Sequence, residues 1–311
     1  MLSVDPALFR PEAVSAETRA FLDRIGAQLA ELPGQHEIPV EVTRRARDEG
    51  RGIFPPGGPL EGSNWLETPA GRLRISEPPG KSRGVYLHIH GGGWSLGRPS
   101  HFDGACQHLA KTAEVTVLSV EYRLAPEHVW PANRDDCLAQ ARWLLEVAEA
   151  RFGTSRLFIG GESAGAHLSA ATLVSLGAER SRFAGAILNY GCYDAGMTPS
   201  AANWGTRKLV LSTPTIAFFA ETVDPDGEMR RDPSGTPLLA DLTDMPPALF
   251  QVGTEDPLLD DTLQMAARWA GAGAVAELAV YPGGIHAFDN FELEITRQFR
   301  ARAAAFIASR L

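Results

Sequence analysis

The sequence has few cysteines and no run of basic residues. Three cysteines among 311 residues, Cys106, Cys137 and Cys192, are an odd number without C-x-x-C spacing. This argues against a disulfide framework and against a zinc site. Lys and Arg total 29 against 38 Asp and Glu, for a formal net charge of −9, and no five basic residues adjoin. We therefore expect no nucleic-acid partner.

Long apolar stretches are absent as well. No window approaches eighteen uncharged apolar residues, so the sequence predicts no membrane span. Residues 1–19 carry acids and prolines where a signal peptide needs an apolar segment. These features predict a soluble, reduced, cytoplasmic protein.

Short β-branched runs alternate with helical periodicity over most of the chain. The runs that predict strands are residues 72–76, 84–88, 115–122, 157–160, 183–190, 248–253 and 276–281. Helical patterns lie at residues 101–112, 135–150, 166–176, 258–270 and 291–310. Strands separated by helices predict an α/β fold with a mainly parallel central sheet flanked by helices.

Two segments interrupt this alternation. Residues 15–32 have the pattern of an amphipathic helix and residues 41–51 that of a second helix, so the first 55 residues are predicted to be an appendage. Between residues 191 and 247 the chain is rich in Pro, Asp and Thr, with one apolar cluster at 216–219. A loop of that length inside a compact domain is usually functional, such as a lid or cap.

A serine lies between a predicted strand and a predicted helix. The sequence Gly-Glu-Ser-Ala-Gly at residues 161–165 occupies that junction. A strand that turns at once into a helix strains its apex residue, and glycines on both sides allow the backbone to approach closely. Ser163 would then stand above the sheet edge at the positive end of a helix dipole. The alternative is a glycine-rich turn with an incidental serine.

A second motif, His-Gly-Gly-Gly-Trp at residues 90–94, follows another predicted strand. Three consecutive glycines expose backbone N–H groups, which suits an oxyanion or a phosphate, but no Gly-Lys-Ser/Thr follows. His88 and His90 lie on one face of the strand, so a metal pair is the rival interpretation. No third or fourth ligand follows at suitable spacing, and we predict no metal and no cofactor.

Four motifs carry a resemblance to a known family. They are HGGGW at 90–94, YRLAPEH at 122–128, GESAG at 161–165 and DPL at 256–258. In this order they resemble the hormone-sensitive-lipase-like branch of the α/β-hydrolase carboxylesterases, also known as α/β-hydrolase fold-3 or bacterial family IV esterases. Glu162 stands where this branch usually has Asp, and Ala166 where a third Gly is common.

The resemblance implies an α/β-hydrolase fold with a small helical cap. Residues 1–55 would form an N-terminal cap segment and residues 193–245 a cap insertion. Residues 56–192 and 246–311 would form the catalytic core.

A nucleophilic serine in this fold needs an acid and a histidine later in the chain. Only His167 and His286 follow Ser163. His167 lies one helical turn into the helix, where packing or capping is its expected role. His286 follows a predicted strand and a Gly-Gly turn, so it can lean over the sheet edge as the base.

Three carboxylates compete for the role of the acid. Asp256 precedes Pro257, which favours an extended conformation at the strand end, whereas Asp260 falls into the following helix. The resemblance also selects Asp256, with Glu255 as the next candidate.

Backbone N–H groups are the expected oxyanion donors. The N–H of Ala164 directly follows the nucleophile, and the resemblance adds Gly92 and Gly93, with Gly91 as a substitute. Glu127 and His128 belong to a segment that we interpret as a structural turn.

Four aromatic residues are candidates for a substrate pocket: Trp94, Trp204, Phe218 and Phe219. Aromatic residues in such places belong to the core about as often as they line a pocket.

Together these features predict a serine carboxylesterase that hydrolyses short to medium acyl esters, small molecules, through an acyl-enzyme. Arylformamidase or amidase activity with the same residues is the alternative. A catalytically silent ligand-binding relative is a weaker one, which the retention of Ser163, Asp256 and His286 opposes. An edge strand or the cap helices could support a homodimer, although nothing in the sequence requires one.

Overall fold

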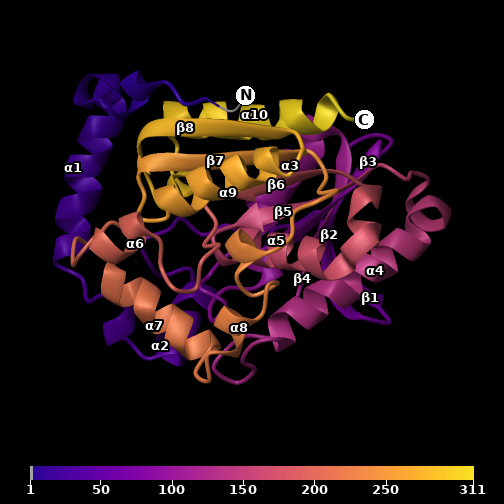
Figure 1. The fold of residues 1–311 in the computed structure, drawn as a ribbon, viewed down its shortest axis with the longest axis horizontal. Coiled ribbons are helices and arrows are strands. Elements are labelled where there is room, and N and C mark those ends of the chain that lie inside the picture. The colour runs from indigo at the N-terminus through magenta and orange to yellow at the C-terminus, as the bar shows by residue number, and fades with distance from the viewer. Residues whose placement is uncertain (1–2) are drawn as a thin grey trace.

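An eight-stranded sheet lies at the centre of the structure, a computed structural model that describes residues 3–311 (Figure 1). The strands are β1 Ser63–Thr68, β2 Gly71–Ser76, β3 Gly84–Ile89, β4 Val115–Val120, β5 Leu157–Glu162, β6 Phe183–Asn189, β7 Ala248–Glu255 and β8 Ala276–Ile285. Their order in the sheet is β1-β2-β4-β3-β5-β6-β7-β8. Only β1–β2 and β2–β4 pair antiparallel, so the predicted mainly parallel sheet is confirmed.

Helices surround this sheet. They are α1 Ala16–Ala30, α2 Val40–Asp48, α3 Asp103–Ala113, α4 Ala132–Phe152, α5 Ala164–Leu176, α6 Pro199–Asn203, α7 Thr213–Val223, α8 Glu228–Arg231, α9 Leu259–Gly271 and α10 Glu294–Ala308. Within residues 3–311, none of the helices combines the length and the apolar character needed to cross a bilayer.

Two apolar layers cover the two faces of the sheet. Successive side chains of a strand point to opposite faces, and in β3 the buried Leu87 packs in one layer and the buried Tyr86 in the other. The first layer includes residues of α4, α5 and α9, and the second includes residues of α3 and α10. This arrangement explains why β3, β4 and most of β5 are buried at successive positions rather than at alternating ones.

The N-terminal helices lie beside the helices of the insertion. Figure 1 shows α1, α2, α6 and α7 gathered on one side of the sheet, at the left and lower left of the view. The α1 helix begins where predicted, because the Ser15 hydroxyl accepts a hydrogen bond from the N–H of Thr18 at 3.1 Å. Its apolar face, with Phe21 and Ile25, packs in a cluster that also contains Ile285 and Phe288.

The structure adds two features that the sequence patterns did not predict. Strand β1 escapes detection because its residues are mostly exposed and polar. In the interval between residues 191 and 247 the patterns showed one apolar cluster, at 216–219, and the resemblance implied a helical cap. This interval contains three short α-helices, of which α7 coincides with the cluster. Pairing with β2 and packing against neighbouring helices, rather than a local pattern, stabilise these elements.

Candidate active site

Ser163 occupies the turn between β5 and α5. Its φ of 57° and ψ of −121° are strained for a residue with a side chain. The turn closes because Gly161 and Gly165 both lie against the backbone oxygen of Ile89, where a Cβ atom would collide. The N–H of Ser163 donates to the carbonyl of Asn189 at 2.9 Å, which ties the turn to β6.

Ser163, His286 and Asp256 form a continuous chain of hydrogen bonds. The hydroxyl oxygen of Ser163 lies 2.8 Å from Nε2 of His286. Nδ1 of His286 lies 2.9 Å and 3.1 Å from the two carboxylate oxygens of Asp256. Because an ionised carboxylate only accepts hydrogen bonds, Nδ1 carries the proton and the Nε2 lone pair faces the serine. Ser163 follows β5, Asp256 follows β7 and His286 follows β8. The carboxyl ends of these three strands share one sheet edge.

The other two carboxylates near Asp256 have different partners. The carboxylate of Glu255 pairs with Arg207 at 2.6 Å. That of Asp260 accepts a hydrogen bond from the N–H of Ser200 at 2.9 Å. Of the three acids considered from the sequence, Asp256 is therefore the one that contacts His286.

The glycine run lies against the serine. Gly91 approaches so closely that an added Cβ would lie 3.4 Å from the Cβ of Ser163. Gly92 has a φ of 128°, and a Cβ there would collide with the carbonyl of Leu96. Within residues 3–311, the N–H groups of Gly92, Gly93 and Ala164 donate to no protein acceptor. Unpaired N–H groups beside a serine suit an oxygen that becomes negatively charged.

Arg44 of α2 braces the loop that follows the glycine run. Its guanidinium donates to the carbonyls of Ser95 at 2.8 Å and Ala125 at 2.7 Å. It also pairs with Glu127 at 2.6 Å and thereby lowers the pKa of that carboxyl. Glu127 thus joins the N-terminal segment to the loop, in line with the structural turn predicted for its segment.

The histidines before the glycine run are engaged in protein contacts. Nε2 of His88 lies 3.1 Å from both oxygens of Glu162, and its Nδ1 lies 2.8 Å from the hydroxyl of Ser119. Burial lowers the pKa of His90 to about 3, so its ring is neutral, and Nδ1 lies 2.9 Å from the carbonyl of Gly91. Across the described part of the chain, no three His, Cys, Asp or Glu side chains gather as metal ligands.

The other histidine after the serine, His167, is fully buried beneath the glycine loop. Its Nδ1 accepts a hydrogen bond from the indole of Trp94 at 3.0 Å, and its Nε2 lies 2.9 Å from the carbonyl of Gly235. The sequence predicted a packing role for His167 but gave no sign of this link to the insertion.

The four candidate aromatic residues do not line one common pocket. Trp94 packs against His167 and is 4% exposed. Trp204 donates its indole N–H to the carbonyl of Arg207, whereas Phe218 lines an open groove on the side of α7 that faces residues 36–41. Phe219 of α7 packs against the glycine run, with its ring over Gly93.

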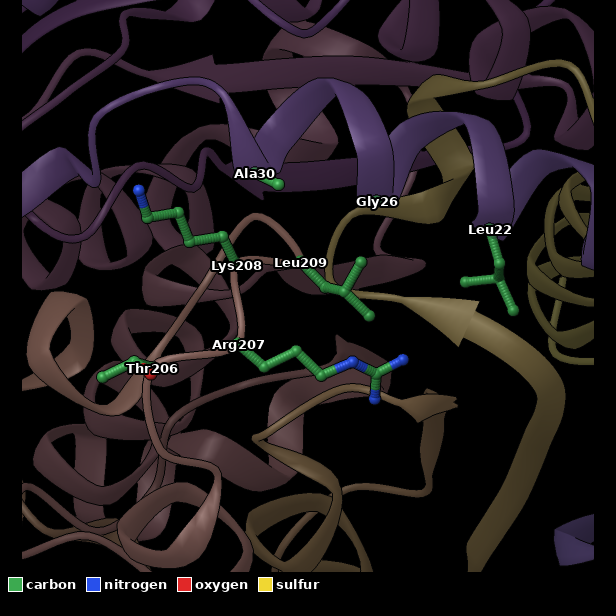
Figure 2. A pocket seen from close by; sticks show the side chains of 7 residues that line it. All are labelled: Leu22, Gly26, Ala30, Thr206, Arg207, Lys208 and Leu209. Atoms are coloured by element: carbon green, nitrogen blue, oxygen red, sulfur yellow. The ribbon is translucent and has the colours of Figure 1, made fainter.

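A cavity of about 420 Å³ lies between α1 and residues 206–209. Figure 2 shows Leu22 and Gly26 on the helix side and Arg207 and Leu209 on the opposite side. The groove beside Phe218 measures about 610 Å³. Ser163, Asp256 and His286 line neither of these two spaces.

Comparison with known proteins gives consistent results. A family model described as alpha/beta hydrolase fold matches residues 86–290. The chain is 34% identical over 217 residues to an ethyl acetate hydrolase of Pseudomonas putida, with 68% of each chain covered. It is 32% identical over 222 residues to the carboxylesterase NlhH of Mycobacterium tuberculosis, again with 68% of each chain covered.

Solved structures extend the similarity to almost the whole chain. A hormone-sensitive lipase from a metagenome library shares 28% identity at a TM-score of 0.83, covering 96% of this chain and 99% of that one. An esterase from the archaeon Pyrobaculum calidifontis shares 27% identity at a TM-score of 0.82, covering 95% of this chain and 98% of that one.

Proposed function

The chain belongs to the α/β-hydrolase family, in its hormone-sensitive-lipase-like branch, and from this premise we propose that it hydrolyses carboxylic esters with Ser163 as the nucleophile. The observation that carries the proposal is the hydrogen-bonded chain from Ser163 through His286 to Asp256. The relatives named as ester hydrolases support the reaction class.

In this proposal each group has its own role. Ser163 attacks the ester carbonyl carbon while its proton passes to Nε2 of His286, and Asp256 stabilises the imidazolium that forms. The carbonyl oxygen takes up the negative charge and accepts hydrogen bonds from the N–H groups of Ala164, Gly92 and Gly93.

Collapse of this intermediate releases the alcohol and leaves an acyl-enzyme. The imidazolium of His286 gives its proton to the departing oxygen. Water then attacks the acyl group with His286 again as the base, which releases the acid and restores Ser163. Every proton in this cycle moves between substrate, water, Ser163 and His286.

The cap is part of the proposal. The predicted cap segments are residues 1–55, of which residues 1–2 lie outside the described part of the chain, and residues 193–245. They would together cover the carboxyl edge of the sheet, and residues 56–192 and 246–311 would form the core. The packing of α7 against residues 35–37 supports a cap made from both segments. Phe219, which stands over Gly93, would limit the acyl chain to short or medium length.

The cellular setting is proposed on chemical grounds. Cys106, Cys137 and Cys192 are free and buried, which suits the reducing conditions of the cytoplasm. A homodimer through an edge strand or the cap helices stays a prediction, which sedimentation of the purified protein can test.

Labelling by a fluorophosphonate tests the nucleophile. We expect one adduct per chain, located on Ser163 by mass spectrometry, and no adduct in S163A. The variant should lose 10⁴–10⁶-fold in kcat, roughly the loss expected when a nucleophile is removed. S181A, which removes an exposed serine hydroxyl, is the matched control and should keep wild-type activity. More than a tenth of wild-type kcat in a folded S163A would contradict the proposal.

Paired substrates separate an esterase from an amidase or arylformamidase. We expect p-nitrophenyl butyrate to be hydrolysed with a kcat/KM at least 100-fold above that of p-nitrobutyranilide or of an N-formyl arylamine. Equal or greater turnover of either amide would assign the alternative activity.

A further inference from the structure

Tyr190 lies where the strands of the site meet. It directly follows β6, whose last residue accepts the hydrogen bond from the N–H of Ser163. Its own N–H donates to the carbonyl of Gln251 in β7 at 2.7 Å. Strands β5, β6, β7 and β8 are neighbours in the sheet (Figure 1). The backbone of Tyr190 is therefore tied both to the turn that carries Ser163 and to the strand that precedes Asp256.

The ring of Tyr190 packs against the base. The Tyr190 and His286 rings have centroids 5.0 Å apart and planes inclined by 70°. The tyrosine side chain is fully buried. Its backbone has a φ of 38°, a conformation that residues with side chains rarely adopt unless the surrounding structure imposes it. This ring is thus held in one place beside the imidazole.

The hydroxyl of Tyr190 is anchored in turn. It donates a hydrogen bond to Asp289 at 2.5 Å. Asp289 lies three residues after His286, in the 3₁₀ turn Phe288–Asn290. Its backbone carbonyl accepts a hydrogen bond from Arg300 of α10 at 2.8 Å. The same short turn therefore connects the base, the carboxylate that fixes the phenol and a helix of the core.

The charges around the hydroxyl keep this hydrogen bond in one direction. Burial, with the carboxylates of Asp289 and Glu162 nearby, raises the pKa of Tyr190 well above its usual value, so the phenol keeps its proton and donates. Burial raises the pKa of Asp289 to about 6, so its carboxyl is ionised and accepts at neutral pH.

We propose that Tyr190 and Asp289 are a positioning pair for His286. The carboxylate of Asp289 fixes the phenol, and the phenol ring holds the imidazole with Nε2 toward Ser163 and Nδ1 toward Asp256. Neither residue contacts the reacting atoms. Their effect is to keep the base in the single orientation that proton transfer needs, where a small misplacement lowers the rate strongly. The inference rests on the proposed function, in which His286 is the base.

Removing either end of the Tyr190–Asp289 hydrogen bond tests the pair. In Y190F and in D289A we expect kcat to fall about 5- to 30-fold with KM within twofold of wild type, because the ring stays but loses its anchor. The double variant should be no slower than the slower single variant, since both changes break one interaction. D289N keeps an oxygen that accepts from the phenol and should recover most of the loss.

A second buried tyrosine supplies the matched control. The hydroxyl of Tyr281 donates to the side chain of Gln251 at 2.6 Å rather than to a residue next to His286. Y281F should lower the thermal unfolding temperature as Y190F does but leave kcat within twofold of wild type. A comparable loss of kcat in Y281F would show that any buried hydroxyl in this region has the same effect, and would overturn the proposal.

The pH profile gives a readout that a structural role would not change. The ionisable groups facing Tyr190 and the imidazole are Asp256, Asp289 and Glu162, with His88 paired to Glu162 and Arg300 behind Asp289. Without the negative charge of Asp289 the imidazolium is less stabilised. We therefore expect the midpoint of the acid limb of kcat/KM to move to lower pH in D289N. An unchanged midpoint would overturn the proposal that Asp289 acts on His286.

Two further outcomes separate this proposal from the proposed function. Wild-type kcat in folded Y190F and D289A would overturn the positioning pair while H286A remains inactive. More than a tenth of wild-type kcat in H286A would instead overturn the role of His286 as the base. If Y190F does not fold, the comparison of D289A with D289N decides, because only Asp289 is changed.

Discussion

The indole N–H of Trp94 donates to Nδ1 of His167 at 3.0 Å, and the opposite nitrogen of that imidazole lies 2.9 Å from the carbonyl of Gly235. One buried side chain thus joins the glycine loop, the helix after Ser163 and the insertion. Burial lowers the pKa of His167 to about 4. The ring is therefore neutral at physiological pH and serves as one acceptor and one donor.

Replacing the indole should weaken this junction. W94F leaves Nδ1 of His167 buried without a donor, which should lower the free energy of unfolding by about 1–3 kcal/mol. Urea denaturation measures the loss. W143F is the control, since the indole of Trp143 contacts Phe152 in a T-shaped pair away from the loop. Equal losses in the two variants would contradict a specific role for the Trp94–His167 hydrogen bond.

Arg44 should affect catalysis from outside the core. R44A removes the hydrogen bonds to the carbonyls of Ser95 and Ala125 that fix the loop after the glycine run. We expect kcat to fall by about tenfold, on the order of 1.4 kcal/mol of transition-state stabilisation. R44K should recover little, because a lysine cannot reproduce the planar fork of donors. R45A removes an exposed neighbouring guanidinium and should leave kcat unchanged. Steady-state kinetics of the three variants decide this.

Phe219 should set the acyl-chain preference. F219A opens space over Gly93, so the ratio of kcat/KM for p-nitrophenyl octanoate to that for the butyrate should rise at least fivefold, about 1 kcal/mol of added apolar contact. F218A is the matched control, because Phe218 lines the groove that faces residues 36–41. A larger shift in F218A than in F219A would place the acyl group on the other side of α7.

Asp261 should make stability depend on pH. Its carboxylate is fully buried and accepts hydrogen bonds from the N–H groups of Tyr193 and Asp194 and from the Thr198 hydroxyl. Burial raises its pKa from 3.8 to about 7. The folded protein therefore binds a proton that the unfolded chain has released, and the free energy of unfolding contributed by Asp261 falls as pH rises from about 4 to about 7.

The size of this effect follows from the shift, at about 1.4 kcal/mol for each unit of pKa. D261N keeps an oxygen acceptor but cannot ionise, so its stability should change less over the same range. Thermal unfolding of both proteins between pH 4 and pH 8 measures the difference. Parallel curves for the two proteins would show that Asp261 has the same pKa in the folded and unfolded states, and would contradict the prediction.

Local sequence patterns predicted much of the fold. Seven of the strands and the long helices were predicted within a few residues, because a buried strand leaves a short β-branched run and an amphipathic helix leaves a helical periodicity in neighbouring residues. Strand β1 was missed because its exposed polar residues become a strand only through pairing with β2. The helices α6 and α8 are too short to show a period.

Some residues of the candidate site could likewise be predicted from the sequence, and others could not. The turn at Ser163 could be predicted because Gly161, Gly165 and the change from strand to helix all lie within a few residues of it. The role of Trp94 could not, because its hydrogen-bond partner lies 73 residues away in the sequence. Nor did any pattern mark Tyr190, which is one apolar residue among others at the end of a strand.

By itself, then, the sequence determined the order of strands and helices along the chain and placed Ser163, Asp256 and His286 each after a strand. The sequence also favoured Asp256 over Glu255 as the acid. Only the tertiary structure decided that Arg44 braces the loop and that Tyr190 packs against the base. The physical reason is that side-chain contacts across β5, β6, β7 and β8 depend on strand order and register, which bring together residues that no local periodicity connects.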